Sequence, residues 1–192
     1  AIDATGELTA GGRTFRLDRA FGLTDYTHGL LARDTAWRWA AAFGALPDGR
    51  PVGLNLVEGF NGGVENVVFL GGEVRGVGAA KFTWEREKPE APWRVATTDG
   101  EVDLTLKVEG VRREDTDLKV AISRYAQPIG AWTGTIGGER VEGLLGVAED
   151  ERVAVAQHEL AAVLGEVQDV GAAAHARAVR GAEVAEDEVI AL

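Results

Sequence analysis

The chain has 192 residues, of which 45% are hydrophobic and 27% are charged. This apolar fraction excludes a disordered chain, and the length suits one domain with its own hydrophobic core. With 20 basic and 31 acidic residues the net charge is −11, which argues against binding to nucleic acid or to an anionic membrane surface. The sequence has no run of about 18 apolar residues, so we expect no membrane-spanning helix.

The residue types that are missing exclude several kinds of site. The chain has no cysteine, which excludes disulfides, thiolate nucleophiles and zinc–thiolate sites. The three histidines, His28, His158 and His175, show no metal-ligand spacing. We therefore predict neither a metal site nor a cofactor. The lack of cysteine and of a signal-peptide pattern is typical of a cytoplasmic protein, which is the location we expect.

Turn signals divide residues 7–147 into about ten to twelve short candidate strands. The pairs at residues 11–12, 71–72 and 137–138 are all Gly-Gly, which is typical of two-residue hairpin turns. The clearest candidate strand is residues 102–109, where apolar and polar residues alternate strictly. We predict an all-β fold in which antiparallel strands close into a barrel, because a closed barrel leaves no long unpaired edge.

The C-terminal part of the chain has a different composition. All 13 aromatic residues lie at or before Trp132, whereas residues 151–192 are rich in alanine, valine and acidic residues. Partial helical spacing from about residue 154 to residue 170 predicts a helix, followed by a poorly ordered tail. We therefore divide the chain into a β-barrel domain, residues 1–150, and a C-terminal extension, residues 151–192.

The densest group of chemically useful residues lies near the start of the predicted barrel. It begins with Asp25, Tyr26 and His28 and continues with Trp37 and Trp39. The two tryptophans lie on one face of a predicted strand, so their indoles either line one wall of a cavity or pack in the core. Asp25 and His28 are a candidate proton-transfer pair, although Asp25 is equally explained as a turn residue.

Several motifs in this region resemble known families. Asp25-x-x-x-Gly29 followed by Trp37-x-Trp39 resembles a signature of the AttH and carotenoid 1,2-hydratase group of lipocalin-like proteins. A closer resemblance, over roughly residues 5–150, is to the C-terminal half of a bacterial family labelled domain of unknown function 2804. The motifs that carry it are residues 25–29, 37–40, 53–56, 65–66, 91–93 and 143–150.

The resemblance implies a calycin-type, lipocalin-like barrel. Relatives of this kind bind apolar small molecules, and some hydrate or cyclise polyenes in an aromatic-lined cavity. The resemblance also implies a partner, the N-terminal half of the family's chains, which this sequence does not contain. Where the family pattern has histidine after Ala-Glu-Asp, this chain has Glu151, and we interpret residues 151–192 as an extension unrelated to the barrel.

Further candidates lie on other predicted strands. Glu65 alternates with Val67 and Phe69. On an interior face its carboxyl group would be desolvated, with a raised pKa, and could donate a proton, whereas on the rim it would be solvated. Asn55 either contacts a cavity or lies on the outer face of its strand. Trp132 either closes one end of the barrel or contacts a ligand.

The sequence thus predicts a lipocalin-like module that binds an apolar small molecule or lipid in an aromatic-lined cavity. An alternative is a cofactor-independent lyase or isomerase acting on an apolar substrate, and a third is a scaffold for the absent half of the family's chain. We expect the indoles of Trp37 and Trp39 to face an enclosed space. The predicted ligand-binding residues are Tyr26, Trp37, Trp39, Asn55, Asn66 and Trp132, and the predicted acid/base residues of the enzyme are Asp25, His28 and Glu65.

Overall fold

The computed structural model describes residues 2–22, 24–26, 32–118 and 121–155. These residues form eleven β-strands and one short 3-10 turn. The chain divides into two compact units. The first unit comprises Ala1–Leu30 and Ala156–Leu192, and the second comprises Leu31–Val155. None of the helical segments in the described ranges has the length and hydropathy needed to cross a membrane.

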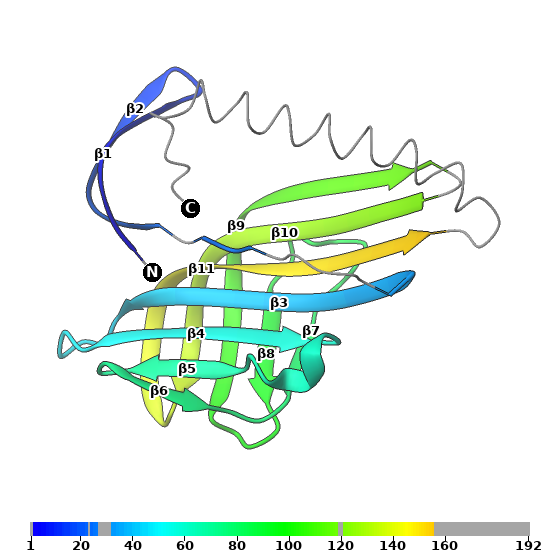
Figure 1. The fold of residues 1–192 in the computed structure, drawn as a ribbon. Helices are drawn as coiled ribbons and strands as arrows, with labels where there is room; N and C mark the ends of the chain where they lie inside the picture. Colours follow the sequence, from blue (N-terminus) through cyan, green and yellow to red (C-terminus); the bar gives the residue numbers. More distant parts are fainter. Residues whose placement is uncertain (1, 23, 27–31, 119–120, 156–192) are drawn as a thin grey trace. The chain divides into compact units, whose positions relative to one another are not determined.

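The first unit contains one β-hairpin. Strands β1 (Ile2–Ala10) and β2 (Arg13–Gly22) pair only with each other and form a two-stranded antiparallel sheet (Figure 1). The turn residues Gly11 and Gly12 have φ values of 56° and 74°, which a two-residue hairpin turn of this kind requires. The predicted domain, residues 1–150, therefore contains two separate sheets.

The second unit contains a single sheet of nine antiparallel strands, which confirms the predicted all-β antiparallel class. The order of strands in the sheet is β6-β5-β4-β3-β11-β10-β9-β8-β7. Strand β11, the last strand of the described residues, thus lies between β3 and β10. The strands are β3 (Asp34–Ala45), β4 (Pro51–Glu58), β5 (Val67–Leu70), β6 (Glu73–Gly76), β7 (Ala80–Thr83), β8 (Trp93–Thr97), β9 (Val102–Asp117), β10 (Ala121–Ile136) and β11 (Glu139–Val155), and the 3-10 turn η1 is Asn61–Gly63.

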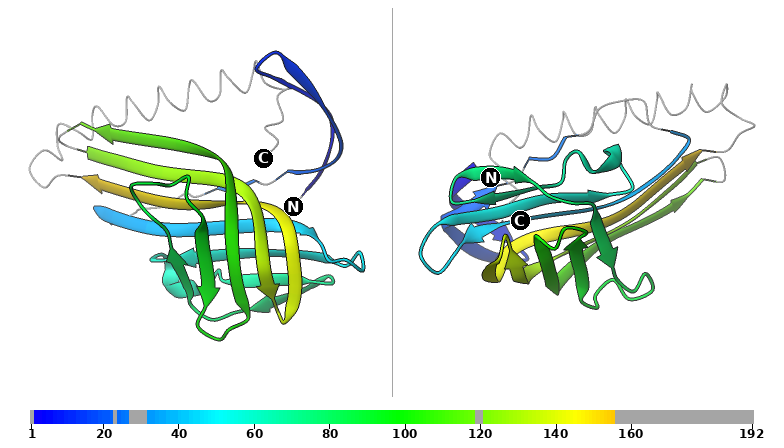
Figure 2. Two further views of the ribbon diagram at one scale, coloured as in Figure 1. Left: turned by 180° about the vertical axis from the view of Figure 1, so that it is seen from behind. Right: turned by 90° about the horizontal axis from the view of Figure 1, so that it is seen from below.

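The nine-stranded sheet curls strongly, as Figures 1 and 2 show, but it does not close by strand pairing. Its two edges, β6 and β7, follow each other in the chain. Strand β7 meets β4 through side-chain contacts: Glu58 of β4 accepts hydrogen bonds from the backbone N–H of Phe82 at 3.1 Å and from Lys81 Nζ at 3.1 Å. The predicted closed barrel is therefore a curled sheet whose β4–β7 seam is held by side chains.

The hydrophobic core lies on the inner face of the curled sheet and draws residues from eight of its strands. In β9 the side chains of Val102, Leu104 and Leu106 are buried in this core, while the residues between them are exposed, as the alternation predicts. The largest fully buried side chains are Trp93 and Trp132. The inner face is therefore both apolar and aromatic.

The predicted C-terminal boundary is wrong at its first residues. Residues 151–155 belong to β11 and pair with β3 and β10, for example Glu151 with Trp37 and Ala154 with Asp34. The predicted helix therefore does not begin at residue 154, because the ladders of two neighbouring strands extend to this point. The rest of the predicted extension, residues 156–192, lies outside the described residues.

Candidate functional site

The paired indoles of Trp37 and Trp39 lie on the same face of β3, and both are partly buried. Ala40 and Ala42, which point to the other face, belong to the packed core. The tryptophans therefore lie on the outer face of the curled sheet. The indoles on its inner face come from other elements, and they are Trp84, Trp93 and Trp132.

Both outer indoles donate hydrogen bonds to polar side chains on neighbouring strands. Trp37 Nε1 donates to Glu149 Oε1 at 3.2 Å, and Gln127 Nε2 donates to the second oxygen of the same carboxylate at 2.7 Å. Trp39 Nε1 donates to Asn55 Oδ1 at 2.9 Å. Asn55 thus lies on the outer face, which was one of the two alternatives for it. These contacts tie β3 to β11 and to β4.

Two glutamates, Glu149 and Glu151, lie next to each other on the outer face of β11, and the pKa of Glu151 is raised. Burial, together with the negative charge of the neighbouring Glu149, raises the pKa of Glu151 to about 7. Glu151 pairs with Trp37 across the β11–β3 ladder, so the carboxyl pair lies beside that indole. This pair is not among the residues predicted from the sequence, because Glu151 falls in the segment interpreted as the extension. The alternation within β11 would have placed Glu149 and Glu151 on one face.

The structure does not support an interior position for Glu65. This residue lies in the turn between η1 and β5, where it is exposed and accepts a hydrogen bond from the side chain of Asn61. Asp25 and Tyr26 are exposed residues of the other unit. His28 lies outside the described residues. The proton-transfer pair of Asp25 and His28 therefore stays a prediction.

Asn66 is buried, with 2% of its surface exposed, and its amide group is used by the protein's own backbone. Its Oδ1 accepts a hydrogen bond from the N–H of Val57 at 2.7 Å. Its Nδ2 donates to the carbonyl oxygen of Gly78 at 3.3 Å. Asn66 therefore links β4 to the connection between β6 and β7, and this supports the β4–β7 seam.

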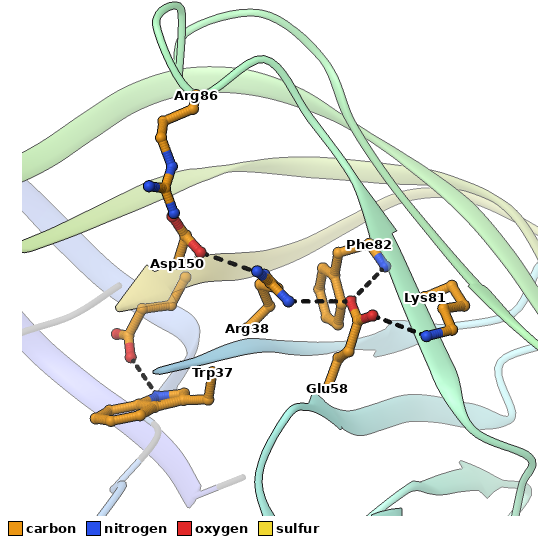
Figure 3. A network of polar contacts seen from close by, with 8 residues as sticks. Trp37, Arg38, Glu58, Lys81, Phe82, Arg86 and Asp150 are labelled. Atoms are coloured by element: carbon orange, nitrogen blue, oxygen red, sulfur yellow. Dashed lines mark hydrogen bonds and ion pairs between the residues drawn. The ribbon is translucent and has the colours of Figure 1, made fainter. Parts of the chain in front are cut away.

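Five charged side chains from different elements meet at one end of the core (Figure 3). Asp150 accepts from Arg38 Nε at 3.3 Å and from Arg86 Nη2 at 3.1 Å. Glu58 accepts from Lys81 and lies 3.8 Å from the Arg38 guanidinium. Only 13% of the Asp150 side chain and 19% of the Glu58 side chain are exposed. We call this group, Arg38, Glu58, Lys81, Arg86 and Asp150, the charged latch.

The charged latch is continuous with the aromatic part of the core. The Arg38 guanidinium lies 5.0 Å from the centre of the Trp84 ring, a cation–π distance. Trp84 in turn stacks on Trp93 with ring centroids 5.1 Å apart. The latch thus contacts the indole of Trp84 near the β4–β7 seam, where the sheet lacks a backbone ladder.

Trp132 occupies the middle of the core with none of its surface exposed. Its Nε1 is buried and has no hydrogen-bond acceptor among the described residues. Trp93, which is equally buried, donates to the carbonyl oxygen of Pro89 at 2.9 Å. A buried donor without a partner costs about 1–3 kcal/mol, so the unpaired N–H of Trp132 is an unfavourable feature of the isolated chain.

Comparison with known proteins identifies the family. Neither the curated proteins nor the solved structures contain a match to this chain. The model of one family, described as Domain of unknown function (DUF2804), matches residues 1–154. Because this match covers most of the sequence, the chain belongs to the DUF2804 family.

Proposed function

We propose that Leu31–Val155 form a lipocalin-like module that binds an apolar small molecule or lipid on the inner face of the curled sheet. The supporting observation is the concentration of three indoles, Trp84, Trp93 and Trp132, on an apolar inner face whose seam lacks a backbone ladder. Barrels of about eight strands have interiors that side chains fill or that hold one small ligand. The proposed ligand is therefore small and mainly hydrocarbon.

The seam between β4 and β7 is the proposed route of access. Opening it breaks side-chain contacts of Glu58 and Asn66, whereas opening any other place in the curled sheet would break a ladder of backbone hydrogen bonds. The Lys81–Glu58 ion pair adds little resistance, because 68% of the Lys81 side chain is exposed and surface ion pairs contribute only about 0–1 kcal/mol.

The second candidate function is the cofactor-independent lyase or isomerase. The observation that favours keeping it is the Glu149–Glu151 pair, because a carboxyl group with a pKa of about 7 can donate a proton at neutral pH. This pair lies beside Trp37 on the outer face. Loss of turnover of an alkene substrate in Glu151→Gln, with unchanged substrate binding, would support this candidate. Unchanged turnover would exclude Glu151 from it.

The outer face is also the proposed contact surface for the N-terminal half of the family's chains. Leu145, with 61% of its surface exposed, lies on this face beside Phe43, and the partly exposed Ile129 lies across from Val147. Exposed apolar side chains gathered on one face are typical of protein contact surfaces. A Leu145→Asp variant should fail to bind a separately produced N-terminal half of a family member, and undiminished binding would refute this proposal.

Two matched tryptophan variants test the binding proposal and its location. Titration of the full chain with Nile red should give saturable fluorescence that decanol displaces. Trp84→Ala, on the inner face, should weaken binding, whereas Trp37→Ala, on the outer face, should leave it unchanged. Weakening by Trp37→Ala alone would place the site on the outer face, and the absence of saturable binding would refute the proposed function.

A further inference from the structure

The inner face contains a stripe of small residues between Trp132 and the charged latch. Gly146 pairs with Gly130 on one side and with Ala42 on the other, and Ala148 pairs with Ala40. The three alanines have no exposed surface. These adjacent positions on β3, β11 and β10 form what we call the small-residue stripe: Ala40, Ala42, Gly130, Gly146 and Ala148.

The indole of Trp132 lies against this stripe. A Cβ atom added to Gly146 would lie 2.9 Å from Trp132 Cδ1, so the absence of a side chain at residue 146 makes room for the ring. Cδ1 is the ring carbon bonded to Nε1. The edge of the indole that faces Gly146 is therefore the edge that contains the N–H group, and this is the N–H group that lacks an acceptor.

Within the described part of the chain, the surroundings of Trp132 provide no acceptor for its N–H group. Alanine and glycine have no polar side-chain atoms, and the strands that contain the stripe form backbone ladders with their neighbours. The indoles of Trp37, Trp39 and Trp93 all donate to acceptors supplied by the protein. A bound molecule or a buried water could supply the acceptor that the described residues do not.

We propose that Trp132 Nε1 donates a hydrogen bond to a single oxygen atom of a neutral, otherwise hydrocarbon ligand bound over the small-residue stripe. This inference rests on the proposed function and deepens it, because it specifies the ligand as a ketone, ester, alcohol or ether. The stripe itself offers no opposite charge to a buried carboxylate or ammonium group, which favours an uncharged ligand. The stripe presents no side chain larger than a methyl group to the hydrocarbon body of the ligand, and the indole fixes the position of the oxygen.

The experiment follows the indole N–H resonances of the full chain by NMR, with each of the five tryptophans assigned through a Trp→Phe variant. The probes are acetophenone, which has a carbonyl oxygen, and isopropylbenzene, which has the same shape without it. Acetophenone should move the Trp132 N–H resonance downfield, whereas isopropylbenzene should not. Replacing Trp132 by β-(3-benzothienyl)alanine, which keeps the shape but removes the N–H, should weaken acetophenone binding about fivefold and leave isopropylbenzene binding unchanged.

Three results would overturn the inference, and they differ in what they mean for the proposed function. If acetophenone moves the Trp84 and Trp93 resonances but not that of Trp132, the binding function stands and the role of Trp132 is wrong. If a nuclear Overhauser effect between the Trp132 N–H and water persists at saturating acetophenone, a buried water is the acceptor. If neither probe moves any inner indole resonance, both the inference and the proposed function are wrong.

Discussion

Replacing Glu58 with alanine should loosen the β4–β7 seam without opening the rest of the curled sheet. The largely buried Glu58 carboxylate accepts hydrogen bonds from the backbone N–H of Phe82 and from Lys81 Nζ, both at 3.1 Å. A hydrogen bond to a charged group contributes about 1.5–3 kcal/mol, and the exposed Lys81 pair contributes about 0–1 kcal/mol. Glu58→Ala should therefore lower the free energy of opening the seam by about 2–4 kcal/mol. Glu58→Gln keeps an acceptor oxygen and should lower it by about 1 kcal/mol.

Amide hydrogen exchange measures this effect where it occurs. In Glu58→Ala the Phe82 amide should lose protection. The amide of Leu104, which lies in β9 between two paired strands, should lose only as much protection as the loss of global stability causes. Glu85→Ala provides the control, because the side chain of Glu85 forms an exposed ion pair with Lys88 away from the Glu58–Phe82 hydrogen bond. If the Phe82 amide exchanges equally slowly in the wild-type protein and in Glu58→Ala, Glu58 does not hold the seam and the proposed route of access is wrong.

Two further variants test other parts of the structure by urea denaturation. Asn66→Ala should lower the free energy of unfolding by about 2–3 kcal/mol, because it leaves the buried N–H of Val57 and the carbonyl of Gly78 without their partner; a loss below 0.5 kcal/mol, a change usual for surface sites, would contradict this role. The pKa of Glu151 is raised from 4.5 to about 7, so the folded chain retains a proton that the unfolded chain releases above about pH 4.5. The stability that this proton provides is complete below pH 4.5 and is lost as the pH rises through 7. Glu151→Gln should remove this pH dependence and stabilise the fold at pH 8, and equal pH dependence in both proteins would show that Glu151 has an ordinary pKa.

Local features of the fold could be predicted because their causes are local. The Gly-Gly pairs at residues 71–72 and 137–138 adopt positive φ values and join β5 to β6 and β10 to β11. The alternation in residues 102–109 matches the buried and exposed sides of β9. A turn requires a particular backbone conformation, and a strand with one buried face requires a period of two, so both leave a direct trace in the sequence.

The features that position the candidate site depend on strand neighbours that are distant in the sequence. Arg38 and Asp150 meet only because β11 lies beside β3, and Glu58 and Lys81 meet only because the sheet curls. Alternation alone predicts that the strand includes Glu65, but β5 begins at Val67. The residues before Val67 form a turn. This turn brings the side chain of Asn66, and not the carboxyl group of Glu65, to the buried side of the β4–β7 seam.

The positions of Trp37 and Trp39 show why the inner face could not be identified from one strand. Strand β3 is apolar on both faces: one has the two indoles, and the other has Ala40 and Ala42. The large size of the two indoles suggests that they face the core. However, the concave side of a curled sheet has less room than its convex side, and side chains from opposite walls share that room. Alanines on β3 therefore make space for indoles that project from β8 and β10. Which side of a strand faces the interior is thus set by the curvature of the whole sheet.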